Sequence, residues 1–344
     1  MNTQNTGTLL AAAGLGALWV ARTAVRWRRA YTLRGKGVLI TGGSRGLGLV
    51  LAHEFGRAGA RVAICARDAA SLTRAQGELA ARGIDAFAVR TDVTEKAQVD
   101  ALVQAVRERL GRVDVLVNNA GTIAVGPIEV MTLADYEKAM RLHFWAPLYT
   151  TLAVLPEMRR RGEGRIVNIA SVGGKLSPPH LLPYNASKFA LVGLSEGCRA
   201  ELAKDGVLVT TVCPGLMRTG SPRHATFKGQ HRAEYVWFSI MDSLPLVSMS
   251  AARAARQIVG ACQRGDAEVV LSLPAQVAVT FHAVFPGMTA DLLGLVNRLL
   301  PAPGGLGSVG AKGEQSGSRL SPSWLTALGD RAARRYNQTG EVKI

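Results

Sequence analysis

The chain has 344 residues, of which 48% are hydrophobic and 19% are charged, so it can form one large globular domain with additional segments and is not a disordered protein. Lysine and arginine outnumber aspartate and glutamate by 41 to 25, a formal net charge of +16. Such a charge suits nucleic acid, an anionic membrane or solubility alone, and because no nucleic-acid-reading motif accompanies it, we expect no nucleic-acid partner.

An apolar stretch near the N-terminus, residues 7–21, precedes a basic cluster. The cluster contains Arg22, Arg26, Arg28, Arg29, Arg34 and Lys36, with Trp27 and Tyr31 between them. This arrangement is typical of a collar at a membrane surface. The stretch is shorter than the roughly 20 residues that span a bilayer, so it either spans or only docks. We predict that residues 1–30 anchor a membrane-associated protein whose remainder lies on the cytoplasmic side. An N-terminal helix that is disordered or docked on the protein is the alternative.

Seven short apolar runs alternate with longer segments of helical periodicity. The runs are residues 38–41, 61–65, 85–89, 113–117, 165–170, 207–213 and 267–272. Residues 71–83 and 96–111 are examples of the helical segments. This alternation predicts an α/β fold with a Rossmann-like, doubly wound parallel sheet of about seven strands and helices on both faces. The four cysteines form no CxxC pair, so we expect reduced thiols and no metal site.

A glycine-rich loop follows the first predicted strand. Gly42, Gly46 and Gly48 lie between that strand and a helical pattern. Glycines at this place let the backbone approach a pyrophosphate, whose charge is stabilised by the free N–H groups of the helix N-terminus. The loop therefore predicts a dinucleotide site.

Two further motifs stand downstream of the glycine loop. Residues 118–121 read Asn-Asn-Ala-Gly, and Tyr184 is followed four positions later by Lys188. Together with the TGxxxGxG spacing of residues 41–48, these motifs closely resemble the short-chain dehydrogenase/reductase family over about residues 36–273. The resemblance implies hydride transfer between a nicotinamide cofactor and a carbonyl or alcohol. It also implies a dimer or tetramer, so we note a possible homo-oligomer.

The choice of nicotinamide cofactor depends on the end of the second strand. Arg67 stands there instead of a carboxylate that would bind a ribose 2'-hydroxyl, and Arg45 lies in the glycine loop. Two guanidiniums suit a 2'-phosphate, and in the family such a pair implies NADP(H). Asp68 is adjacent and weakens this preference. The cofactor contacts that the resemblance implies are Gly42, Ser44, Arg45, Gly46, Leu47, Gly48, Arg67, Asp92, Val93, Asn119, Ala120, Gly121, Tyr184, Lys188, Pro214, Gly215 and Thr219.

Tyr184, Lys188 and Ser171 are the principal catalytic candidates. A phenol has a reference pKa of about 10, so a tyrosine that exchanges a proton near neutral pH needs a nearby cation to stabilise its phenolate. Lys188 lies one helical turn after Tyr184. Ser171 ends a predicted strand 13 residues before Tyr184, the family spacing for the serine that donates to the substrate oxygen.

His143 departs from the family pattern. The family usually has an asparagine there, which holds a water in a proton relay that runs past the lysine. An imidazole both donates and accepts hydrogen bonds, so His143 is a fourth catalytic candidate, and a packed histidine that orients its helix is the alternative.

Residues 221–248 are expected to form a substrate lid. Its apolar side chains suggest either a lipophilic pocket wall or ordinary lid packing, and they are Phe227, Tyr235, Trp237, Phe238, Ile240 and Met241. Residues 273–300 are apolar around Pro286 and Gly287, which suits a core helix, a dimer contact or a second membrane-docking element. Residues 301–317 are rich in glycine, proline and serine and predict a flexible connector.

The sequence thus predicts an anchor (1–30), a catalytic domain (31–273) and a C-terminal apolar segment with a flexible tail (274–344). We expect an NADP(H)-dependent oxidoreductase that interconverts a carbonyl and an alcohol on a small lipophilic molecule such as a steroid, retinoid, ketosphingoid or long-chain carbonyl. The alternative is a membrane-associated adaptor or sensor that binds NADP(H) without turnover.

Overall fold

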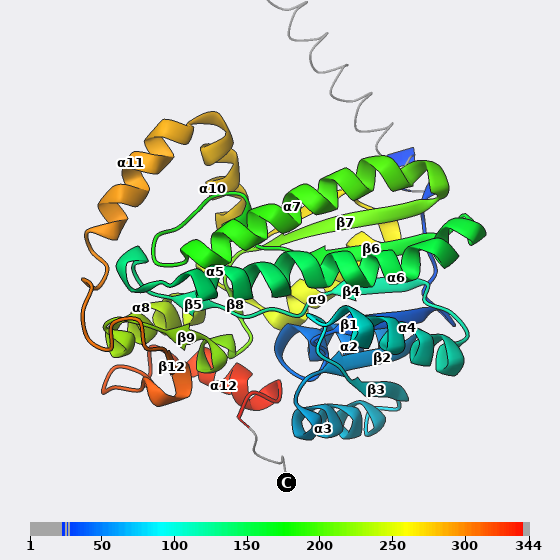
Figure 1. The fold of residues 1–344 in the computed structure, drawn as a ribbon, viewed down its shortest axis with the longest axis horizontal. Helices are drawn as coiled ribbons and strands as arrows, with labels where there is room; N and C mark the ends of the chain where they lie inside the picture. The colour runs from blue at the N-terminus through cyan, green and yellow to red at the C-terminus, as the bar shows by residue number, and fades with distance from the viewer. Residues whose placement is uncertain (1–22, 25, 27, 340–344) are drawn as a thin grey trace, which may run out of the picture.

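The computed structural model describes residues 23–339 except residues 25 and 27. Seven parallel strands form the central sheet in the order β3-β2-β1-β4-β6-β7-β11 (Figure 1). The strands are β1 (Gly37–Thr41), β2 (Arg61–Ala66), β3 (Ala86–Arg90), β4 (Val115–Asn118), β6 (Gly164–Ile169), β7 (Val207–Pro214) and β11 (Glu268–Leu271). The predicted seven-stranded parallel sheet is confirmed.

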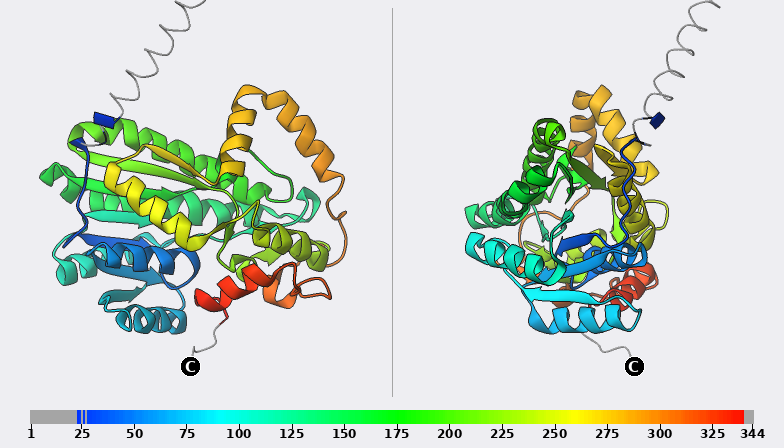
Figure 2. Two further views of the ribbon diagram at one scale, coloured as in Figure 1. Left: turned by 180° about the vertical axis from the view of Figure 1, so that it is seen from behind. Right: turned by 90° about the vertical axis from the view of Figure 1, so that its right-hand side faces the viewer.

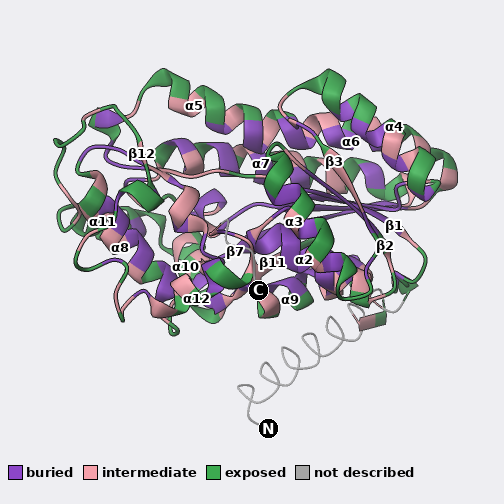
Figure 3. Ribbon diagram, turned by 90° about the horizontal axis from the view of Figure 1, so that it is seen from below, coloured by how far each residue is buried: buried purple, intermediate pink, exposed green. Residues whose placement is uncertain are grey.

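Helices cover both faces of this sheet, as the view along the strands shows (Figure 2). One face carries α2 (Gly46–Arg57), α3 (Ala69–Ala80) and α9 (Ala251–Arg264), which share one apolar core with the strands. The other carries α4 (Lys96–Leu110), α6 (Ala146–Arg161) and α7 (Leu182–Leu202), which share a second core. Because both faces are covered, the central strands are almost continuously buried and each helix exposes only its outer side (Figure 3).

The strand order reverses between β1 and β4. The strands that follow β1 in the chain are added on one side of it, and those that follow β4 are added on the other side. β1 pairs with β2 on one side and with β4 on the other, all parallel. In such a sheet the loops after these two strands separate and leave a crevice at their carboxyl ends. The sequence places the glycine loop and residues 118–121 at those ends.

The lid region consists of a 3₁₀ turn (Ser221–His224), β9 (Thr226–Phe227) and α8 (His231–Ser243). Phe227, Tyr235 and Phe238 are at most 5% exposed and pack as one cluster, with the Phe227 ring centroid 5.3 Å from that of Tyr235. Together with Trp237, Ile240 and Met241, these side chains were a candidate pocket wall, but none of the six lines the cavity described below. Ordinary lid packing, the other alternative, accounts for the four aromatic side chains, because they contact one another edge-on.

Two helices after β11 form a projecting hairpin, α10 (Leu273–Val284) and α11 (Pro286–Asn297). The exposed apolar side chains of the hairpin, together with Leu299 two residues after α11, are Leu273, Val277, Val284, Phe285, Met288, Leu292, Leu295, Val296 and Leu299. Of the three possibilities for residues 273–300, a core helix is therefore wrong.

The segment predicted as a flexible connector is bound to the lid. Within residues 301–317, β12 (Ala311–Lys312) pairs antiparallel with β9, which in turn pairs with β5 (Ala124–Val125). Gly229 exchanges backbone hydrogen bonds with Leu306 and Gly307 at 2.9 Å. The compositional prediction of a free tail is wrong here because backbone pairing does not require apolar side chains. The chain then continues into α12 (Ala327–Arg335).

The predicted anchor, residues 7–21, lies outside the described residues. Part of the basic cluster that follows is bonded to the domain: Arg26 Nε lies 2.8 Å from Asp266 Oδ1, and Lys36 Nζ lies 2.7 Å from Glu163 Oε1. Between residues 23 and 339, apart from 25 and 27, no helix has the length and apolar character needed to cross a membrane.

Candidate active site

The glycine loop is held against the end of β4 by its own backbone. Gly42 has a φ of +66°, and an added Cβ there would lie 2.9 Å from the Cα of Ala120. A Cβ on Gly48 would lie 2.1 Å from the carbonyl oxygen of Gly42. Only glycine fits at these two positions, so the sequence motif reports a real steric requirement.

Asn119 and Thr41 connect the two loops that flank the crevice. The Thr41 hydroxyl oxygen accepts hydrogen bonds from the backbone N–H groups of Asn119 and Ala120 at 3.0 and 3.1 Å. The Asn119 side chain donates to the carbonyl oxygens of Thr41 and Gly42 at 3.0 and 3.2 Å. The crevice therefore has a fixed floor before any ligand binds.

Asn118 holds neighbouring strands together. Its Nδ2 donates to Asn168 Oδ1 at 2.9 Å, and its Oδ1 accepts from the Thr150 hydroxyl at 2.6 Å. Asn168 in turn donates to Ser195 Oγ at 3.0 Å. Because these amides are buried and paired, the role of Asn118 is structural.

The end of β2 presents Arg67 and Asp68 in different ways. The Arg67 side chain is 64% exposed, and its Nη1 lies 3.7 Å from Asp92 Oδ2. The Asp68 carboxylate accepts a hydrogen bond from Ser71 N at 2.7 Å and caps α3. The Ser71 side chain, and in addition the Ser71 backbone N–H, lowers the pKa of Asp68. A carboxylate engaged as a helix cap is less available to a ribose hydroxyl.

Ser171, Tyr184 and Lys188 meet at the opposite end of the crevice. Ser171 follows β6, and its Oγ accepts from Gly173 N at 3.0 Å. The side chains of Tyr184 and Ser171 lie beside each other: a Cβ added to Gly173 would be 3.3 Å from Tyr184 Cε1 and 3.4 Å from Ser171 Oγ. Lys188 Nζ lies 5.7 Å from the Tyr184 ring centroid and donates to the Ile169 carbonyl oxygen at 2.8 Å. The first turn of α7 thus places a phenol and an amine on one face, as the spacing of four predicts.

Burial moves the pKa values of this pair in opposite directions. It raises the pKa of the Tyr184 phenol to about 12 and lowers the pKa of the Lys188 amine to about 7. Both shifts follow from the cost of placing a charge in a dry environment. Without a bound ligand, burial outweighs the stabilisation of the phenolate that the sequence suggested. At neutral pH the phenol therefore keeps its proton.

Both ring nitrogens of His143 already have protein partners. Nε2 accepts from Thr122 N at 3.2 Å, so Nδ1 carries the hydrogen and donates to Ser187 Oγ at 2.7 Å. Burial lowers the pKa of this imidazole, so it is neutral. The ring packs edge-on against Tyr184, with centroids 5.4 Å apart. His143 lies in a π-helical turn at Arg141–Trp145. Its hydrogen bonds favour the alternative in which the side chain orients this helix. A part for His143 in a proton relay stays a prediction.

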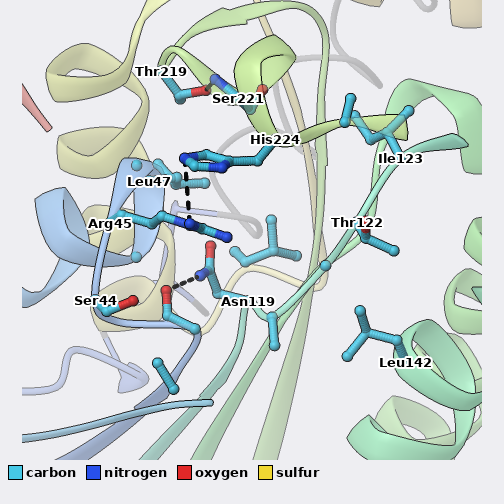
Figure 4. A pocket seen from close by; sticks show the side chains of 18 of the residues that line it. Ser44, Arg45, Leu47, Asn119, Thr122, Ile123, Leu142, Thr219, Ser221 and His224 are labelled. Carbon is cyan, nitrogen blue, oxygen red and sulfur yellow. Dashed lines mark hydrogen bonds between the residues drawn. The ribbon is translucent and has the colours of Figure 1, made fainter. Parts of the chain in front are cut away.

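One cavity of about 450 Å³ contains nearly all the predicted site residues (Figure 4). Every predicted cofactor contact lines it, as do all the catalytic candidates except His143. Sequence reasoning missed His224, Lys312 and Gln338, which also line it. These three come from the lid and the C-terminal segment, and no local motif marks them.

The family assignment follows from comparison with known proteins. The sequence model of the short chain dehydrogenase family matches residues 36–227, more than half of the chain. The chain is a short-chain dehydrogenase/reductase.

Relatives and solved structures agree with this assignment. The short-chain dehydrogenase/reductase described here is 40% identical over 183 residues to a putative ketoacyl reductase of Streptomyces coelicolor, a match that covers 53% of the chain and 70% of the relative. It is 34% identical to dehydrogenase/reductase SDR family member 7B of Bos taurus, over 83% of the chain and 88% of the relative. A crystal structure of a short-chain dehydrogenase from Streptomyces avermitilis superposes with a TM-score of 0.65 at 33% identity, over 76% of the chain and 98% of that structure.

As a short-chain dehydrogenase/reductase, the chain is an oxidoreductase that acts on small molecules with a nicotinamide cofactor. The residues present fit such a dinucleotide. Gly42, Gly46 and Gly48 line the cavity at the N-terminus of α2, and the cavity runs from Arg67 past this loop to Tyr184 and Lys188. A pyrophosphate would therefore lie at the N-terminus of α2, between the end of the cavity at Arg67 and the end at Tyr184 and Lys188.

Proposed function

We propose that this oxidoreductase uses NADP(H) to interconvert a carbonyl and an alcohol on a lipophilic molecule. The observation that carries the proposal is the placement of Tyr184, Ser171 and Lys188 side by side in a cavity that Arg45 and Arg67 also line.

Proton transfer would be the work of the chain's own side chains. A bound nicotinamide supplies or accepts the hydride. Tyr184 and Ser171 both lie next to Gly173 and line the same cavity, so one carbonyl oxygen would accept hydrogen bonds from both. Tyr184 then gives its proton to that oxygen, and Lys188, when charged, stabilises the phenolate left behind. Ser171 donates to the oxygen as negative charge grows on it.

The preference for NADP(H) over NAD(H) rests on charge at the exposed end. Burial, and in addition the charge of Arg67, lowers the pKa of Arg45. Burial, and in addition the charges of Lys138, Arg45 and Arg67, lowers the pKa of Lys312. A dianionic 2'-phosphate bound among Arg45, Arg67 and Lys312 would be stabilised by all three positive charges. The Asp68 carboxylate caps α3 through its hydrogen bond from Ser71 N and is therefore less available to a ribose 2'-hydroxyl.

A lipophilic substrate and a membrane surface are supported by the α10–α11 hairpin. Residues 273–300 carry only His282, Asp291 and Arg298 as ionisable side chains, and Phe285 and Leu292 are 47% and 53% exposed. The hairpin and the chain at residue 23 lie along the same edge of the molecule in all three views of Figures 1 and 2. The predicted anchor, residues 7–21, lies outside the described residues, so the hairpin carries this support by itself.

The activity is tested by following oxidation of NADPH and of NADH by the full chain with four carbonyl classes. These are a steroid ketone, retinal, a long-chain 3-ketoacyl thioester and a short hydrophilic ketone. We expect at least one lipophilic carbonyl to be reduced with NADPH in preference to NADH. Turnover confined to the hydrophilic ketone would remove the substrate proposal, and a preference for NADH would remove the cofactor proposal.

Membrane association is tested by cosedimentation with vesicles of phosphatidylcholine and phosphatidylserine. The double substitution Phe285→Asp and Leu292→Asp should weaken vesicle binding by about tenfold, because a charge in the apolar layer of the bilayer is unfavourable. Leu246→Asp is the control, since Leu246 is 88% exposed but lies outside the hairpin. Equal binding of all three proteins would show that the hairpin does not touch lipid.

A further inference from the structure

The last described residues of the chain lie against the glycine loop. We call Tyr336–Gln338 the C-terminal strap. The Tyr336 carbonyl oxygen accepts from Gly46 N at 2.9 Å, and Asn337 Nδ2 donates to the Ser44 carbonyl oxygen at 2.8 Å. The loop that would hold a pyrophosphate is thus bonded to a segment nearly 300 residues away.

The Asn337 side chain forms hydrogen bonds with Ser44, Ser71 and Arg74. Besides Ser44, its Nδ2 donates to the Ser71 carbonyl oxygen at 3.0 Å, and its Oδ1 accepts from Arg74 Nε at 3.0 Å. Its φ of +59° belongs to the left-handed region, which asparagine tolerates better than most residues. These contacts fix the strap to both α3 and the glycine loop.

Gln338 forms part of the cavity wall. It is 5% exposed, and its Nε2 donates to the Thr219 carbonyl oxygen at 3.2 Å. Its Oε1 is buried and has no hydrogen-bond partner within the described part of the chain. A buried acceptor without a partner is costly, and in a cavity lined by Gly46 and Thr219 a donor of the bound dinucleotide would satisfy it.

His224 links the strap to Arg45. Its Nε2 lies 3.2 Å from Arg45 Nη1 and 3.0 Å from the Gln338 carbonyl oxygen, and Figure 4 shows its ring next to the guanidinium. Burial lowers the pKa of His224 to about 4, so the ring is neutral. A neutral ring nitrogen either accepts from Arg45 or donates to Gln338, and cannot do both.

We propose that the C-terminal strap is a clamp on the dinucleotide, in which Gln338 contacts the cofactor and His224 couples closure of the strap to the phosphate that Arg45 binds. The proposal rests on the proposed use of NADP(H). When a phosphate binds Arg45 and replaces His224 as its hydrogen-bond partner, the ring hydrogen of His224 can lie on Nε2. Nε2 then donates to the Gln338 carbonyl oxygen. Binding of the phosphate and closure of the strap then favour each other.

The clamp is tested by hydrogen exchange on the full chain, alone and with saturating NADPH or NADH. The amides of residues 327–338 report the strap and α12, because Gln338 N donates to the Ala333 carbonyl oxygen at 2.9 Å. We expect NADPH to slow their exchange by about tenfold and NADH to slow it less. In His224→Phe the difference between the two cofactors should disappear.

A binding experiment supplies a second readout. Asn337→Gly removes three hydrogen bonds and keeps the left-handed backbone accessible, so we expect it to weaken NADPH binding by about tenfold in a fluorescence titration. Asn297→Gly, an exposed asparagine at the end of α11, is the matched control and should bind NADPH as the parent chain does.

The outcomes separate the clamp from the proposed function. If NADPH binds and leaves exchange of residues 327–338 unchanged, the clamp is wrong while the use of NADP(H) stands. If NADPH speeds this exchange, the strap blocks the site instead of closing it, and the clamp is wrong again. If NADPH does not bind in the titration, both proposals fall together.

Discussion

The two ends of the cavity differ in their contact with water. At the catalytic end Lys188 is 4% exposed, whereas at the phosphate end the Arg67 side chain is 64% exposed. Burial moves the pKa values of Tyr184 and Lys188 in opposite directions, while charge at the exposed end is screened. One end is therefore suited to proton transfer, and the other to selecting a cofactor by charge.

The largest effect is expected from Tyr184→Phe, which removes the proton donor and keeps the ring. The rate of carbonyl reduction should fall by about 10³-fold or more, the scale of general acid catalysis. NADPH binding should stay within about twofold, because the phosphate end is untouched. Stopped-flow kinetics and a fluorescence titration on the same sample measure both quantities. A variant that still turns over at a tenth of the parent rate would remove Tyr184 from the chemical step.

Ser171→Ala should lower the rate by about 10²-fold, because one donor to the developing negative charge is lost. The effect should fall on kcat more than on KM. Ser177→Ala is the matched control, since Ser177 Oγ accepts from Asn185 Nδ2 at 3.0 Å and does not line the cavity. Equal losses in the two variants would argue that the serine at 171 only supports the fold.

At the exposed end, Arg67→Gln should weaken NADPH binding by about tenfold and leave NADH binding unchanged. The effect is smaller because solvent screens the charge. Arg57→Gln provides the control, with a side chain that is 73% exposed at the far end of α2. A parallel loss for both cofactors would mean that Arg67 holds the fold of the loop and does not contact a 2'-phosphate.

The smallest effect is expected from Asp68→Ala, which removes the cap of α3. The free energy of unfolding should fall by about 1 kcal/mol, measured by urea denaturation. Asp85→Ala serves as control, because Asp85 is 86% exposed and caps no helix. If Asp68 bound the ribose instead of the helix, stability would be unchanged and NADH binding would weaken.

The sheet and most of the site could be predicted because they depend on local patterns. Gly42 and Gly48 meet a steric requirement that any sequence of this loop must satisfy, and Tyr184 and Lys188 share a face because of helical periodicity alone. Ser171 follows a strand whose end is visible in the sequence. Each of these features needs only its neighbours in the chain.

The incorrect and missing predictions concern contacts between distant segments. The lid aromatics Phe227, Tyr235 and Phe238 could line a pocket or pack together, and only their positions in space decide this. His143 is polar and close to the site, but Thr122 and Ser187 occupy its nitrogens. Gln338 reaches the cavity because α12 returns the chain to the glycine loop, and the sequence does not show that return.

The dependence of the two reaction directions on pH tests the account most directly. Lys188 has a pKa lowered to about 7, so its stabilising charge is present below that pH and is lost above it, while Tyr184, with a pKa raised to about 12, stays protonated. Carbonyl reduction with NADPH should therefore fall as pH rises through about 7. Alcohol oxidation, which needs the Tyr184 phenolate beside charged Lys188, should rise toward about pH 7 and level off above it, because that state binds as many protons as protonated Tyr184 beside neutral Lys188. The step should vanish in Lys188→Met. Profiles that move in the same direction, or a step that persists without Lys188, would contradict the account.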